Sequence, residues 1–194
     1  MMSPAEFQWD PRVKVNVSKT MSHALRHEPW LYELELDAEG WTPVEQLLVA
    51  LQETREPWQG LMLEHLQEIV ASSPKKRFEL VDGRIRAFYG HSLSQTIRKE
   101  PAVPPERLFH GTSPETVPLI EKSGLLPMAR QYVHCSADRE TAQLVGQRKA
   151  QRPVILEIES ARAYTAGVPF YLGNELIWLA DQVPPEYICF PKSF

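Results

Sequence analysis

The stretch "RFELVDGRIRAFY" at residues 77–89 decides how the first half of the chain folds. Apolar and polar residues alternate on both sides of Asp82-Gly83, and this dipeptide between two alternating runs is a strong signal for a tight hairpin turn. We therefore predict a two-stranded ribbon that reverses direction at Asp82-Gly83.

The second strand of this ribbon carries an unusual set of side chains. Arg84, Arg86 and Phe88 occupy alternate positions, so we expect them to share one face, with Tyr89 on the other. An aromatic ring beside guanidinium groups could stack a base and hold a phosphate. The same set is also typical of a solvated strand with cation–π contacts. The ribbon alone leaves both interpretations open.

Helical spacing of apolar residues precedes the ribbon. The windows are "VSKTMSHALRH" (17–27), "WTPVEQLLVALQ" (41–52) and "LMLEHLQEIVASS" (61–73). We expect Ser18 to cap the first helix. Thr42 should cap the second, with Pro43 as its first residue and Glu45 completing a capping box. Helices followed by a ribbon favour a winged-helix arrangement, which occurs both on nucleic acids and as a protein–protein module.

The chain changes character after a proline-rich stretch, "KEPAVPPERLF" at 99–109. We interpret this stretch as a crossing between two lobes. Short apolar runs follow: "RLFHG", "YVHCS", "PVILEIE", "VPFYL", "LIWLAD" and "EYICF". Two helical windows separate them, one ending at Gly124 and one with Ser136 as its expected cap. The pattern predicts an α+β fold with a lobe at 1–98, a linker at 99–107 and a lobe at 108–194.

The composition is that of an ordinary globular protein, with 43% hydrophobic and 24% charged residues among 194. The net charge of −4, from 21 Lys+Arg against 25 Asp+Glu, argues against coating of duplex nucleic acid by bulk electrostatics. It leaves room for a local arginine pocket that holds one phosphate.

We expect neither a secretory signal nor a membrane-spanning segment in this chain. The start, "MMSPAEFQWDPRVKV", lacks the layout of a secretory signal, and no window reaches membrane-spanning length. Cys135 and Cys189 could form a disulfide, but we expect two reduced, buried thiols in a cytoplasmic protein. His110 and His134 beside Cys135 do not form a complete metal-ligand spacing, so no metal is expected.

Individual polar residues give weak signals. Arg26-His27 ends a helical window, and Arg148 ends another. The helix dipole favours cations at such positions, so it is enough by itself to explain these residues. His110-Gly111-Thr112 combines hydrogen-bonding side chains with a glycine that would let a ligand approach the backbone. P-loop, dinucleotide-binding and nucleophile-elbow motifs are missing.

The order of the pieces is more specific than any one of them. The pieces are "SKTMSHALRHEPW", "LDAEGWTPVEQLL", "RIRAFYGHS", "LFHGTS", "SGLLPMARQYVHCSADRETA", "VGQR" and "GVPFYLGNELIWLADQVPPEYI". From about Val17 onward the chain resembles the RNA 2′-phosphotransferase family of the KptA type. The resemblance implies a winged-helix lobe that holds the RNA end, followed by a lobe of the ADP-ribosyltransferase fold that binds NAD+.

The resemblance also implies a site. The family's catalytic set falls on Arg26, His27, Arg86 and Arg148. Its NAD-binding positions fall on His110, Gly111, Thr112, Gly124, Leu125, Arg130, His134, Ser136 and Arg139. The chain departs from the family where "RAFYGHS" stands for the common "RANQGHS", so Phe88-Tyr89 replaces two amides.

The reaction implied by the family moves an internal RNA 2′-phosphate to NAD+. It passes through an ADP-ribosylated RNA and releases nicotinamide and ADP-ribose 1″,2″-cyclic phosphate, without a metal. The expected partners are a tRNA-like RNA and NAD+, with no membrane, and a monomer is expected. One alternative is an ADP-ribosyltransferase that caps terminal phosphates of RNA or DNA. Another is a winged-helix regulator that only senses NAD+.

Overall fold

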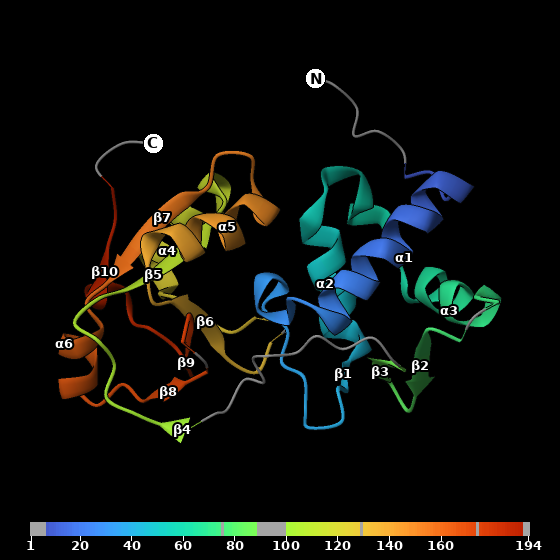
Figure 1. The fold of residues 1–194 in the computed structure, drawn as a ribbon. Helices are drawn as coiled ribbons and strands as arrows, with labels where there is room; N and C mark the ends of the chain where they lie inside the picture. Colours follow the sequence, from blue (N-terminus) through green and yellow to red (C-terminus); the bar gives the residue numbers. More distant parts are fainter. Residues whose placement is uncertain (1–6, 75, 89–99, 129, 174, 192–194) are drawn as a thin grey trace, which may run out of the picture. The chain divides into compact units, whose positions relative to one another are not determined.

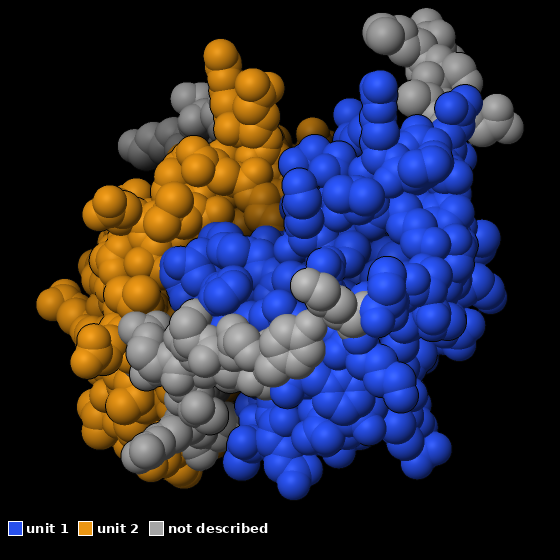
Figure 2. All heavy atoms as spheres, turned by 45° about the vertical axis from the view of Figure 1, so that its right-hand side comes forward, with its two compact units in different colours: residues 1–94 blue, residues 95–194 orange. Residues whose placement is uncertain are grey.

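The computed structural model describes residues 7–74, 76–88, 100–128, 130–173 and 175–191. Its contacts divide the chain into two compact units, Met1–Ser94 and Gln95–Phe194, which Figure 2 colours separately. The fold is mixed α+β: helices dominate the first unit, and an antiparallel sheet dominates the second (Figure 1).

The first unit consists of helices packed beside a small sheet. Its helices are α1 (Pro11–Arg26), α2 (Val44–Thr54) and α3 (Leu63–Ser72), with 3₁₀ turns at Pro29–Tyr32 and Glu56–Gly60. Its strands are β1 (Thr42–Pro43), β2 (Phe78–Val81) and β3 (Arg84–Ala87), in the antiparallel order β1-β3-β2. Asp82 and Gly83 both have positive φ, 49° and 73°, as a tight hairpin turn requires. The predicted hairpin is confirmed.

The apolar stripes of the helices form the core of this unit. Met21, Ala24 and Leu25 of α1 are fully buried, as their helical spacing predicts. In α2, Val44, Leu47 and Leu51 are buried, whereas Leu48 is only partly covered. The ribbon adds Phe78, so the core is shared between helices and sheet.

The start of α1 differs from the sequence prediction. The helix begins at Pro11, and Asp10 caps it: its Oδ1 accepts hydrogen bonds from the N–H groups of Arg12 (2.7 Å) and Val13 (2.9 Å). Ser18 lies inside the helix, so its predicted cap role is wrong. An aspartate followed by proline satisfies the first turn better than a serine within an already periodic window.

The start of α2 also differs. Thr42 belongs to β1, where it pairs with Ile85 of the ribbon, and α2 begins at Val44 after Pro43. No side chain caps this helix, so the predicted capping box between Thr42 and Glu45 is wrong. Because Thr42 pairs with Ile85 of β3, it extends the sheet and does not cap α2.

The second unit is built on one sheet. Its strands are β4 (Glu100–Pro101), β5 (Leu108–Thr112), β6 (Val133–Ser136), β7 (Val154–Ile158), β8 (Phe170–Leu172), β9 (Ile177–Ala180) and β10 (Ile188–Cys189). Its helices are α4 (Val117–Ser123), α5 (Arg139–Lys149) and α6 (Ser160–Thr165), with 3₁₀ turns at Pro114–Thr116 and Pro185–Tyr187. The strand order is β10-β7-β5-β6-β9-β8-β4, with antiparallel neighbours. The predicted strands are confirmed, whereas β4 and α6 were not predicted.

Three local predictions in this unit have different outcomes. Gly124 ends α4 with φ 72°, as predicted. Ser136 was expected to cap α5, but it lies in β6, and Asp138 is the cap, accepting from the N–H of Thr141 at 2.7 Å. Both cysteines are free, as expected; Cys135 is buried, but Cys189 is exposed at the sheet edge, which corrects that part of the prediction. Cys189 is exposed because β10 is a two-residue strand at the edge of the sheet, with a neighbouring strand, β7, on one side only.

Within the described ranges, no helix is long and apolar enough to cross a membrane. The same residues contain no cluster of three or more His, Cys, Asp or Glu side chains that could hold a metal ion.

Candidate functional site

Arg26 lies at the C-terminal end of α1, against the start of the ribbon. Its Nη2 donates to the carbonyl of Arg77 at 3.4 Å, and its guanidinium lies 5.8 Å from the centre of the Phe78 ring. The N–H of Phe88 donates to the same carbonyl at 3.0 Å. One backbone oxygen therefore joins the helix end to the residue that follows β3.

His27 is the next residue and the C-cap of α1. Its backbone N–H donates to the carbonyl of His23 at 3.0 Å, while its side chain is exposed. The His23 ring, 5.9 Å away between centroids, contacts Tyr32 (Nδ1 to Oη, 3.1 Å) and Glu28 (Nε2 to Oε2, 3.5 Å). Two imidazoles therefore lie at this helix end, and the one at position 27 is presented to solvent.

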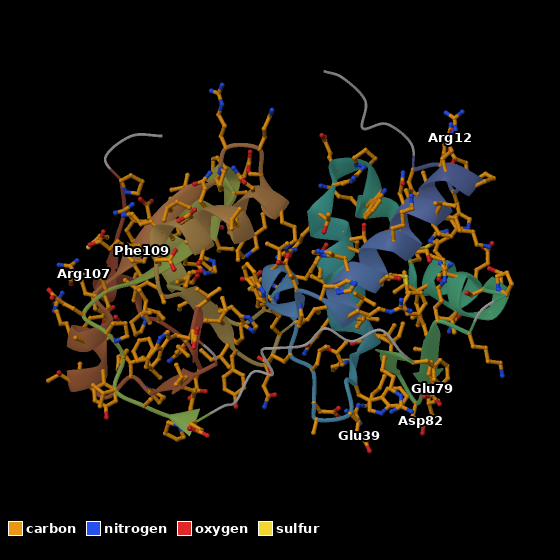
Figure 3. The ribbon with its side chains drawn as sticks, viewed as in Figure 1. Arg12, Glu39, Glu79, Asp82, Arg107 and Phe109 are labelled. Atoms are coloured by element: carbon orange, nitrogen blue, oxygen red, sulfur yellow. The ribbon has the colours of Figure 1, made fainter. Side chains whose placement is uncertain are left out.

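Arg86 is held by its cross-strand partner. Glu79, which Figure 3 labels, pairs with Arg86 across β2 and β3. Its Oε2 accepts from Nε at 2.8 Å and contacts Nη2 at 2.7 Å. The guanidinium lies 4.5 Å from the centre of the Trp41 ring. Arg84 lies 5.7 Å from the same ring centre, which confirms that the two arginines share a face.

The loop before β1 fixes Trp41. Asp37 Oδ1 accepts hydrogen bonds from the N–H groups of Glu39 and Trp41, both at 2.9 Å, and its other oxygen pairs with Arg84. Partial desolvation by itself would raise the pKa of Asp37, but the hydrogen bonds from Trp41 and Arg84 and the one from Glu39 outweigh it and lower this pKa. The ionised carboxylate therefore organises the loop that places the ring. The sequence does not identify Trp41 as a site residue; its only signal is its place after the turn residues "DAEG".

Arg26 and Arg86 make different contacts in the ribbon region. Phe78, on which Arg26 rests, pairs with Ala87, and both are buried in the core. Arg86 is the strand neighbour of Ala87, and adjacent residues of a strand point to opposite faces. The structure therefore gives the two arginines separate partners within the same unit.

In the second unit, buried polar side chains occupy the two central strands. His110 and Thr112 of β5 and His134 and Ser136 of β6 are each less than 10% exposed. His110 Nδ1 lies 2.9 Å from the carbonyl oxygen of His134. Because a carbonyl only accepts, Nδ1 carries the proton in this contact, and a neutral ring would then present Nε2 as an acceptor.

Gly111 lies where α5 packs directly on β5. A Cβ at this position would lie 2.1 Å from the carbonyl oxygen of Ala142 and 2.9 Å from Cα of Gly146. The helix could not approach so closely over any larger residue. This contact fixes the height of α5 above the sheet, and with it Arg148, which is 8% exposed. The structure thus supplies a packing reason for a glycine that the sequence associated with a ligand.

Gly124 and Leu125 join the end of α4 to the segment after β9. Leu125 exchanges backbone hydrogen bonds with Val183, at 2.8 and 2.9 Å, and a Cβ on Gly124 would lie 2.2 Å from the Val183 carbonyl. Arg130 follows a turn in which Met128 has φ 56°, and its N–H donates to Pro127 at 3.0 Å.

Arg139 belongs to an ion-pair network on β7. Its Nη2 donates to Glu157 at 2.7 Å, and Arg107 donates to the same carboxylate at 2.8 Å. The Arg139 guanidinium also lies 5.1 Å from the centre of the Phe109 ring; Figure 3 labels Arg107 and Phe109. The structure therefore brings His110 and His134 together but holds Arg139 against Glu157. Tyr89 and the "GHS" that follows lie outside the described residues.

Comparison with known proteins connects these observations. Residues 12–182 match the family model described as "RNA 2'-phosphotransferase, Tpt1 / KptA family". A "Probable RNA 2'-phosphotransferase" of Bacillus thuringiensis subsp. konkukian is 53% identical over 178 residues, which cover 92% of this chain and 96% of the relative. A protein of the same name from Acetivibrio thermocellus is 49% identical over 174 residues, 90% of this chain and 95% of the relative. Another, from Rhizobium rhizogenes, is 41% identical over 176 residues, covering 91% and 93%.

The match includes the end of α1, the ribbon, the central strands and α5, which carry the residues described above. Because it spans both units and nearly the full length of each relative, the chain belongs to the RNA 2′-phosphotransferase, Tpt1/KptA family.

Proposed function

We propose that this chain moves an internal 2′-phosphate of RNA to NAD+, releasing nicotinamide and ADP-ribose 1″,2″-cyclic phosphate through an ADP-ribosylated RNA. The observation that carries the proposal is the family match over residues 12–182, which includes Arg26, His27, Arg86 and Arg148 on ordered elements of the fold. RNA 2′-phosphotransferase activity is the function of this family; the two reaction steps and the role of each residue in them are proposed.

The two units fit two different tasks, one the binding of RNA and the other the binding of NAD+. Helices α1–α3 with the sheet β1-β3-β2 support a winged-helix lobe at 1–98 that holds the RNA. The antiparallel sheet carrying α5 supports an ADP-ribosyltransferase lobe at 108–194 that takes NAD+ as co-substrate. The proposed linker, 99–107, contains β4, which pairs with β8 and thereby ties the linker to the second sheet.

In the first step an oxygen of the RNA 2′-phosphate forms a bond to the anomeric carbon of the nicotinamide ribose. The bond to nicotinamide breaks, and its electron pair leaves with the ring. Holding both reactants in line supplies much of the rate enhancement for such a displacement. The polar side chains of His110, Thr112, His134 and Ser136 fit this task because they lie on the neighbouring strands β5 and β6.

In the second step the ribose 2″-oxygen attacks phosphorus, and the bond from phosphorus to the RNA 2′-oxygen breaks. Negative charge grows on the phosphoryl oxygens, and Arg26, Arg86 and Arg148 supply fixed positive charge and directed donors. His27 gives its proton to the departing 2′-oxygen, while the proton of the 2″-hydroxyl is released. Exposure of the His27 side chain permits contact with a large RNA substrate.

The direct test incubates the protein with NAD+ and an RNA bearing one internal 2′-phosphate. We expect stoichiometric nicotinamide, RNA with a free 2′-hydroxyl, and ADP-ribose 1″,2″-cyclic phosphate, all resolved by chromatography. A parallel reaction uses a 5′-phosphorylated RNA of the same sequence. ADP-ribose left on the terminal phosphate, with no cyclic product from the 2′-phosphorylated RNA, would instead identify a terminal-phosphate ADP-ribosyltransferase.

Glu79 is predicted to position Arg86. Replacing it as Glu79→Gln keeps the size but removes the charge that holds Nε and Nη2, so we expect kcat to fall about tenfold with a smaller change in KM. In an Arg86→Ala background the same replacement should cost nothing further, because Glu79 acts through that arginine. Glu39→Gln, the same charge change at an exposed loop position, is the control. An equal loss from Glu79→Gln in both backgrounds would show that its effect does not depend on Arg86.

A further inference from the structure

A groove of about 400 Å³ lies between α1 and α3, within the first unit. Its lining includes the cations Lys14, Lys19 and Arg77 and the hydroxyls of Ser18, Ser72 and Ser73, with apolar side chains between them. Among its described lining residues there is no carboxylate. In a chain with a net charge of −4, this combination singles out a local surface for an anionic ligand.

The cations of the groove are not equivalent. Lys14 Nζ lies 2.7 Å from Glu68 Oε1, so an ion pair already offsets its charge. Lys19 and Arg77 are exposed. The carbonyls at the end of α3, near Ser72, disfavour anions. Phosphates would therefore lie along the side formed by α1 and the start of the ribbon, where Lys19 and Arg77 stand.

The groove and the proposed catalytic pair lie along the same helix, α1. Lys19 and Arg26 are seven residues apart, which places them on the same face and roughly 10 Å apart along the helix. Arg77 lines the groove, and its carbonyl oxygen accepts the Arg26 hydrogen bond. A polymer with regularly spaced phosphates could follow Lys19 and Arg77 to Arg26.

We propose that this groove binds the phosphodiester strand next to the 2′-phosphate, as an extended subsite for single-stranded RNA; this inference rests on the function proposed above. Cations that follow the backbone, with an apolar floor for a ribose or base, are the usual elements of a single-strand binding surface. The reactive phosphate itself is held elsewhere, so the groove sets affinity for longer RNA and leaves the chemistry unchanged.

The test compares two substrates with the same internal 2′-phosphate, a dinucleotide and an oligonucleotide extended on both sides. For Lys19→Glu combined with Arg77→Glu, we expect KM for the long RNA to rise about tenfold with kcat unchanged, and KM for the dinucleotide to stay constant. The dependence of log KM on log salt for the long RNA should weaken by roughly one to two phosphate contacts. Lys76→Glu makes the same reversal one residue away, outside the groove lining, and serves as the control.

The outcomes separate this inference from the function on which it rests. If the unmodified protein converts neither substrate, the proposed function is wrong. In that case, binding of unphosphorylated RNA, followed by fluorescence anisotropy, still compares the double variant with Lys76→Glu. If both substrates are converted and the double variant keeps its KM for the long RNA, the groove is not an RNA subsite. An equal loss on both substrates, or displacement of the RNA by a polyglutamate peptide at equal charge concentration, also overturns the inference.

Discussion

His27→Ala is expected to stop the reaction after its first step, so that RNA-2′-phospho-ADP-ribose accumulates while nicotinamide is still released. Protonation of a poor leaving group by a positioned imidazole contributes about 10²–10⁴-fold, and the departing RNA 2′-oxygen is such a group. The first step expels nicotinamide, which leaves as a neutral molecule and needs no proton. Loss of the imidazole should therefore slow only the second step.

The measurement is a time course with RNA carrying a labelled 2′-phosphate, in which substrate, intermediate and product are resolved on a gel. His23→Gln is the matched control: this imidazole lies one turn earlier on α1 and contacts Tyr32 and Glu28, so its replacement should not trap the intermediate. Normal release of cyclic phosphate by His27→Ala, or equal slowing of both steps, would remove the general-acid role from His27.

The local parts of the fold could be predicted because short-range patterns determine them. The turn at Asp82-Gly83 has the positive φ values that these residues tolerate, and the ribbon followed from two alternating runs. The stripe of Met21, Ala24 and Leu25 identified the buried face of α1. In each case, the residues that determine the structure are neighbours in sequence.

The errors occur where a distant strand or a neighbouring residue competes with the local pattern. Thr42 has the sequence context of a helix cap, but β3 lies more than forty residues later and recruits it into a sheet. Ser18 and Ser136 were chosen as caps because they precede periodic windows, whereas Asp10 and Asp138 accept the N–H hydrogen bonds. The sequence cannot show which of two competent side chains the tertiary fold will bring into place.

The candidate site follows the same rule. The family resemblance predicted Arg86 as a site residue. Strand alternation predicted that Arg86 shares a face with Arg84, and both guanidiniums lie near the Trp41 ring. Glu79 and Trp41, which hold it, depend on strand register and on a loop conformation fixed by Asp37. These contacts join segments far apart in sequence, so single-sequence patterns do not contain them. Gly111 shows the converse: the motif marked the residue, but its packing partner could be found only in three dimensions.

Gly111→Ala is expected to destabilise the second unit and to lower activity together. A Cβ at 2.1 Å from the Ala142 carbonyl lies far inside van der Waals contact, and the atom it meets is helix backbone rather than a flexible side chain. Overpacking of this kind typically costs about 1–3 kcal/mol, and more where the neighbour cannot yield. To relieve the clash α5 must move away from β5, which displaces Arg148 on the same helix. We expect a lower free energy of unfolding in urea and a fall in kcat of at least about tenfold.

The comparison of stability with kinetics decides between two reasons for this glycine. If Gly111 is required only for a ligand to approach the backbone, its replacement should raise KM for NAD+ and leave the unfolding free energy unchanged. If it is required for α5, stability and kcat should fall together. Gly146→Ala should then reproduce the loss, because its Cβ would lie 2.7 Å from Pro153 Cβ and 3.1 Å from Gly111 Cα. Gln147→Ala, an exposed change between Gly146 and Arg148, should alter neither quantity, since it changes no packed surface of the helix.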